Sequence, residues 1–74
     1  MKGILITTTN VDMLAGRYAI EAEDKEDLLP IGYILVTDFG NDDWYDVLSE
    51  EVFAANYEWG DAIGNEFKVV TRKP

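Results

Sequence analysis

Residues 32–39 have the sequence GYILVTDF, which is the strongest strand pattern in the chain. Apolar and β-branched side chains fall on both faces of this segment, as is typical of a strand in the middle of a sheet. The next four residues, GNDD, have the composition of a turn. We therefore expect residues 44–48, WYDVL, to return beside the first segment as the second strand of a hairpin.

A helix is expected directly after this hairpin. Ser49 can accept a hydrogen bond from the first helical turn, and the two glutamates that follow it lie where the helix dipole favours negative charge. Phe53 and Tyr57 are four residues apart and share one face of the helix, which predicts that both are buried scaffold. Gly60 can end the helix at about Trp59.

Three further segments have strand patterns. Residues 2–9 are rich in apolar and β-branched side chains, residues 14–22 alternate between two faces, and residues 66–72 alternate again. The chain therefore predicts the order β-β-β-β-α-β in one domain, residues 1–74. The expected fold class is α+β, with a small antiparallel sheet of about five strands and one short helix. Five short strands must roll up to bury a face, so we expect a partly closed, SH3-like sheet.

Charge is distributed unevenly along the chain, whose net charge is -9. Fourteen carboxylates and a single basic side chain, Lys25, lie between Tyr18 and Phe67. Charges of one sign on a small domain create a field that attracts cationic partners and repels nucleic acid and anionic lipid. We therefore expect a protein partner with a basic surface, no direct binding to nucleic acid and no membrane association.

Several kinds of chemistry are excluded by composition. The chain has no Cys and no His, which excludes disulfides, zinc sites of the usual kind and Cys- or His-based nucleophiles. A chain of 74 residues has little room for an enclosed pocket. We expect no enzyme activity, no catalytic residue and no cofactor. The chain has no apolar segment of membrane-spanning length and no signal-peptide pattern, so a cytoplasmic location is expected.

Oxygen ligands gather in the hairpin, and they leave two interpretations open. A solvated hairpin tip is expected from the turn preferences of Asn and Asp, and a hard cation such as calcium is the alternative. The spacing does not match an EF-hand loop, so no metal site is assigned. The residues concerned are Asp38, Asn41, Asp42, Asp43 and Asp46.

Aromatic side chains flank the densest acidic region, which is typical of a protein-binding surface with rings as anchors and charges that steer association. We expect Tyr45, Phe53 and Tyr57 to lie largely inside, and Trp44 or Trp59 to be partly exposed. The expected partner-binding residues are Asp42, Asp43, Trp44, Asp46, Glu50, Glu51, Glu58, Trp59 and Asp61. Should that surface not bind, the next candidate is the acidic group Glu21, Glu23, Asp24 and Asp27.

Residues 32–58 resemble a pattern seen in short phage and prophage proteins. In that pattern a strand that begins with Gly is followed by a return strand and a helix of the form Ser-x-x-x-Phe-x-x-x-Tyr, matched here by Ser49, Phe53 and Tyr57. The resemblance implies a phage accessory protein and assigns no catalytic residue. The composition is also similar to that of small acidic phage proteins that inhibit restriction, CRISPR or host DNA-binding enzymes, some of which mimic DNA.

Two functions are therefore expected as alternatives. The first is a phage-type protein, acting in the host cytoplasm, that inhibits or modulates a host protein, with carboxylates in the place of DNA phosphates. The second is a structural or assembly module that associates through sheet edges, as a homodimer or with another component. Residues 2–9 and 67–72 carry no acidic side chain and are the expected edges.

Overall fold

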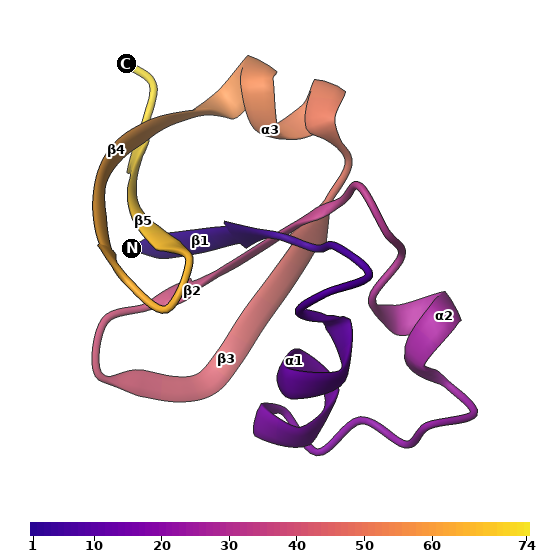
Figure 1. Ribbon diagram of the computed structural model, residues 1–74. Helices are drawn as coiled ribbons and strands as arrows, with labels where there is room; N and C mark the ends of the chain where they lie inside the picture. The colour runs from indigo at the N-terminus through magenta and orange to yellow at the C-terminus, as the bar shows by residue number, and fades with distance from the viewer.

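A computed structural model describes residues 1–40 and 44–74. It contains five antiparallel strands in one sheet and three helices, a mixed α+β fold (Figure 1). In chain order the elements are β1 (Lys2–Leu5), α1 (Val11–Arg17), α2 (Lys25–Leu28), β2 (Ile34–Asp38), β3 (Asn41–Leu48), α3 (Glu50–Asn56), β4 (Tyr57–Gly64) and β5 (Phe67–Arg72).

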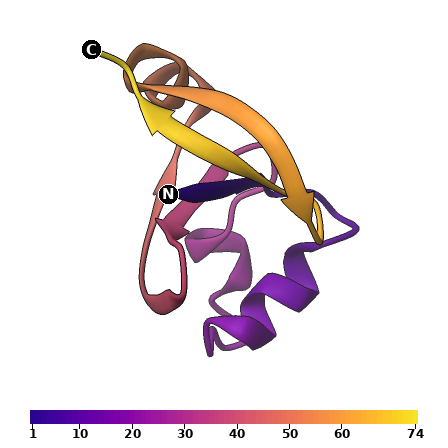
Figure 2. The same cartoon turned by 90° about the vertical axis from the view of Figure 1, so that its left-hand side faces the viewer.

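The strands lie in the order β3-β2-β1-β5-β4, so that β1 is central and β3 and β4 are the edges. The first four residues of β2 are buried, which confirms the prediction that this segment is an interior strand. The β2–β3 hairpin is also confirmed, with Leu35 opposite Val47 and Ile34 opposite Leu48. Figure 2 shows α3 at one end of the view and α1 and α2 at the other, with the sheet between them.

The larger core lies between the sheet and the α1–α2 side. Ile4 and Leu35 are register partners on β1 and β2 and present their side chains to this side. Leu14 of α1 is fully buried against them, and Phe67 of β5 completes the cluster. The buried members are Ile4, Ile6, Val11, Leu14, Ala15, Leu29, Leu35 and Phe67.

The smaller core lies under α3. Its buried members are Ile34, Val36, Phe53 and Val70. Phe53 is the only buried residue of α3. The predicted cap is confirmed, because the Ser49 hydroxyl accepts a hydrogen bond of 3.3 Å from the backbone N–H of Val52.

The prediction of a strand over residues 14–22 is wrong, because this segment begins in the helix α1. Val11, Leu14, Ala15 and Tyr18 follow the i, i+3, i+4, i+7 spacing of a helix face, and the first three are buried. The helix ends in a Schellman arrangement, in which the N–H of Ile20 donates to the carbonyl of Ala15. Ala19, with φ of 55°, takes the left-handed position that usually holds Gly.

The prediction that the helix extends to about Trp59 is wrong, because Trp59 lies in the strand β4. The helix α3 stops at Asn56, and Tyr57 is already extended. Tyr57 and Trp59 pair with Arg72 and Val70 of β5, which holds this segment in a strand. Gly60 is not a helix terminus, because it lies in β4, where a Cβ would come within 3.1 Å of the Val69 side chain.

The expected partial closure into an SH3-like barrel is not confirmed. The sheet runs open from β3 to β4, and among the described residues no strand pairing joins these two edges. Helices lie on both sides of the sheet, so residues on both of its faces are buried without closure into a barrel. The prediction that residues 2–9 and 67–72 form the sheet edges is wrong. These segments contain β1 and β5, which are interior strands.

Candidate functional site

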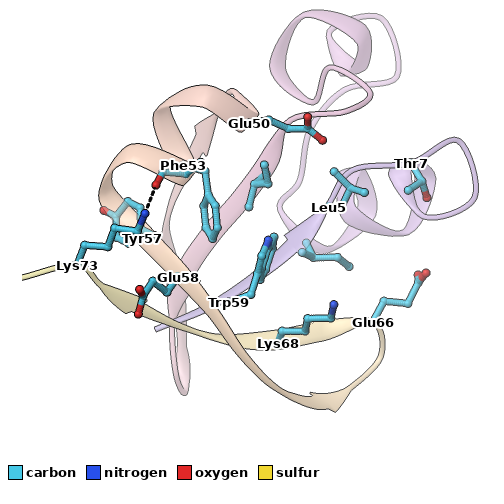
Figure 3. A pocket seen from close by; sticks show the side chains of 13 residues that line it. Leu5, Thr7, Glu50, Phe53, Tyr57, Glu58, Trp59, Glu66, Lys68 and Lys73 are labelled. Atoms are coloured by element: carbon cyan, nitrogen blue, oxygen red, sulfur yellow. Dashed lines mark hydrogen bonds between the residues drawn. The ribbon is translucent and has the colours of Figure 1, made fainter.

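A groove lies on the α3 side of the sheet, where the short helix leaves part of this face uncovered. It has a volume of about 940 Å³ and is lined by α3, β4, β5 and the end of β1. Figure 3 shows Trp59 near its middle, with Phe53 on the α3 side and Leu5 on the β1 side. Leu5 and Trp59 are each 41% exposed, so the groove offers apolar surface to a partner.

The Trp59 ring is held in place by its neighbours. Its centroid lies 4.5 Å from that of Phe53, and Gly3 of β1 leaves room on another side. A Cβ on Gly3 would come within 3.3 Å of the Trp59 ring and 2.8 Å of Cγ2 of Val70. The absence of a side chain at residue 3 therefore lets the indole approach the central strand, and the ring needs little ordering before a partner binds.

Both signs of charge line this groove. Glu50, Glu58 and Glu66 bring three carboxylates, which surround the Trp59 ring in the projection of Figure 3. None of the three forms an ion pair with another described residue. The two lysines are engaged within the protein: Lys73 Nζ donates to the carbonyl of Ala54 at 2.5 Å, and Lys68 Nζ lies 5.6 Å from the Trp59 ring centroid.

Basic side chains gather around β5 and lie over aromatic rings. Lys2 and Arg17 approach the ring of Phe67, at 4.9 and 5.5 Å from its centroid. Arg72 lies 5.8 Å from the ring centroid of Tyr57. These cation–π contacts attach the basic side chains to aromatic rings of the fold.

One ion pair connects α1 to α2. Lys25 Nζ lies 2.6 Å from Asp12 Oδ1. This hydrogen bond, together with the Coulomb attraction of the same carboxylate, raises the pKa of Lys25 above its usual value. Other carboxylates near α2 are exposed, and they include the second candidate group, Glu21, Glu23, Asp24 and Asp27.

The structure brings together three of the nine predicted partner-binding residues, Glu50, Glu58 and Trp59, in the groove. The exposed residues Trp44 and Asp46 lie on β3, the opposite edge of the sheet. Glu51 is exposed on α3, and Asp61 is exposed on β4 within the register shift between Trp59 and Ala62. Asp42 and Asp43 lie outside the described residues, and so does Asn41 of the cation alternative.

The aromatic residues of the predicted site differ in how deeply they are buried. Phe53 is 4% exposed and Tyr45 and Tyr57 are half-buried, while Trp44 and Trp59 are 44% and 41% exposed. Partial exposure of the two tryptophans is therefore confirmed.

Sequence reasoning missed Gly3, Leu5 and Lys68 as parts of this site. A glycine within a strand is a known signal for close approach of another group, and Gly3 carries that signal. Its partner could not be read from the sequence, because Trp59 was expected on a helix. In the part of the chain that is described, no group of three or more carboxylates could hold a metal ion, and no helix is long and apolar enough to cross a membrane.

Comparisons with known proteins identify no relative of this chain. No protein-family model, no curated protein and no solved structure matches the chain.

Proposed function

We propose that this chain is a small, non-catalytic protein of phage type that binds a host protein at a basic surface and inhibits or modulates it. The observation that carries the proposal is the excess of negative charge in the chain. The net charge is -9, and fourteen carboxylates and one basic side chain lie between Tyr18 and Phe67. A cationic partner is the class of molecule that such a field attracts most strongly.

The groove supports a protein partner over a simple counterion. Interfaces in which a few residues carry most of the binding energy favour tryptophan at a preformed site, with charges around it. Trp59 meets that description, because Gly3 and Phe53 position its ring and Glu58 lies beside it.

Mimicry of DNA is the form of inhibition that we propose. The carboxylates would take the places of phosphates at a nucleic-acid-binding surface, where duplex DNA presents one charge about every 1.7 Å along its axis. The proposal of a phage protein rests on the resemblance of residues 32–58, and such a protein would act in the host cytoplasm.

The experiment is affinity capture from a bacterial lysate on the immobilised protein, at low salt, with mass spectrometry of the retained proteins. The proposal predicts retention of nucleic-acid-binding proteins, their release by salt, and their displacement by duplex DNA. Retention that is independent of salt, or no retained nucleic-acid-binding protein, would contradict DNA mimicry.

Two charge-reversed variants serve as matched controls for the capture. Glu50→Lys with Glu58→Lys reverses two carboxylates of the groove, and Glu23→Lys with Asp24→Lys reverses two exposed carboxylates next to α2. Both variants change the net charge equally. Loss of capture in the first variant alone assigns binding to the groove, and loss in the second alone moves the site to the α2 side.

The alternative proposal is a structural module that assembles through a sheet edge. The edges open to such pairing are β3 and β4. Both edges carry acidic side chains and register shifts, features that hinder the addition of a strand, so neither edge is favoured over the other for this alternative. Sedimentation distinguishes the two functions, because a stable oligomer at micromolar concentration supports assembly and a monomer supports the inhibitor.

A further inference from the structure

The Trp59 ring already has a cation of the same chain as its neighbour. Lys68 Nζ lies 5.6 Å from the ring centroid, although Lys68 itself is an exposed residue of β5. The negative face of an indole ring attracts a cation, and at exposed sites this attraction is weak enough to be exchanged. The position of Lys68 therefore marks a place in the groove where a positive group is favourable.

The side chains around the Trp59 ring favour a cation of a partner protein over the ammonium of Lys68. Glu50, Glu58 and Glu66 line the same groove and have no basic partner among the described residues. A lysine ammonium is a compact and strongly hydrated charge. An arginine guanidinium is planar, stacks on aromatic rings and can hydrogen-bond to a carboxylate through two N–H groups at once.

We propose that the groove binds an arginine side chain of the partner protein, stacked on Trp59 in the place that the Lys68 ammonium occupies in the free protein. At least one of the three groove glutamates accepts hydrogen bonds from the guanidinium. This inference rests on the proposed function, which requires a basic partner, and it specifies the residue type that the partner must present.

Trp59 can be observed alone in a Trp44→Phe background, because the chain has two tryptophans. The probes are hexa-arginine and hexa-lysine peptides of equal charge, added at low salt. The proposal predicts that hexa-arginine changes the Trp59 emission and binds about twofold to fivefold more tightly than hexa-lysine, a difference of the size of one cation–π contact at an exposed site.

A pair of variants tests the exchange with Lys68. Lys68→Thr removes the cation over Trp59, whereas Lys2→Thr removes the cation over Phe67 and changes the net charge equally. The proposal predicts tighter hexa-arginine binding in Lys68→Thr than in Lys2→Thr. Equal affinities in these two variants contradict the exchange.

The outcomes separate this inference from the proposed function. Equal binding of both peptides without a change in Trp59 emission contradicts the arginine site. The proposal of a cationic partner is not affected by that result. Failure of both peptides to bind at low salt overturns the arginine site and the proposed function together.

Discussion

The two faces of the sheet differ in how completely they are covered. The face under α1 and α2 buries eight residues in one cluster, whereas the face under α3 buries four and leaves a groove beside them. The difference follows from α3, a helix of seven residues that inserts one buried side chain, Phe53. In so small a domain, the well-packed face supplies most of the stability, and the incompletely covered face is where a partner can bury apolar surface.

The largest expected effect tests whether α3 is nevertheless required for folding. Phe53→Ala removes the one buried ring of the helix, and we expect a loss of about 3–5 kcal/mol in the free energy of unfolding. A domain of this size has only a few kcal/mol available, so the variant should be unfolded by circular dichroism. Val52→Ala, at an exposed position of the same helix, is the control and should stay within about 0.5 kcal/mol. A folded Phe53→Ala with a near-native melting temperature would show that α3 does not contribute to the core.

Gly3→Ala tests the packing of Trp59 on the central strand. The new Cβ would meet Val70 and the Trp59 ring, and such overpacking costs about 1–3 kcal/mol. Thermal unfolding should show the loss, and the emission of Trp59 should change in a Trp44→Phe background. The contrasting variant is Gly16→Ala in α1, where no atom lies near the added methyl group, and where a gain of about 0.5–1 kcal/mol is expected. Equal melting temperatures for the two variants would contradict the close approach at Gly3.

The substitution Glu66→Gly is expected to change the stability of the protein and its binding of a partner in opposite directions. Asn65 and Glu66 both have positive φ in the two-residue turn between Gly64 and Phe67, a type I′ arrangement in which Gly is favoured at the second position. We expect a gain of about 1 kcal/mol in stability and weaker binding of a cationic partner, because a groove carboxylate is lost. Asn65→Gly is the control and should gain less, since Asn tolerates this conformation. A lower melting temperature in Glu66→Gly would contradict the turn assignment.

The smallest expected effect concerns the α1–α2 side. The raised pKa of Lys25 means that its ion pair with Asp12 adds stability below the usual lysine pKa of 10.5, and that this contribution is lost as the pH rises through the higher folded value. Titration of Lys25 by NMR should give a pKa above 10.5 in the parent protein and a lower one in Asp12→Asn. An unchanged pKa in that variant would show that Asp12 is not its cause.

Local patterns predicted the elements whose residues have a single interpretation. Residues of β2 are apolar on both faces, Ser49 is a strong capping residue, and both features appear as expected. The segment around Tyr18 supports two interpretations, because Tyr18 and Ile20 alternate as in a strand while Leu14 and Tyr18 have helical spacing. The helix was favoured by burial of Val11, Leu14 and Ala15 against β1 and β2, which depends on the rest of the fold.

Prediction of the site failed where it depended on strand register. Tyr57 has a helical spacing from Phe53, yet pairing with β5 extends the chain from Tyr57 onward. That pairing brings Trp59 opposite Val70, and the pairing of Gly3 with Lys68 brings the central strand and the lysine to the same place. The contacts of Gly3 with Trp59 and Lys68 join residues more than fifty positions apart, so no local pattern indicates them.

The most direct test of the central claim is to map amide and indole chemical shifts by NMR while hexa-arginine is added. The two indole N–H signals belong to Trp44 and Trp59, which have nearly equal exposure and lie at opposite edges of the sheet. We predict that the largest changes occur at the Trp59 indole and at the amides of Glu58, Glu66 and Lys68, with the Trp44 indole little affected. The largest changes at residues 21–27, with an unchanged Trp59 indole, would contradict the assignment of the binding site to the α3 side.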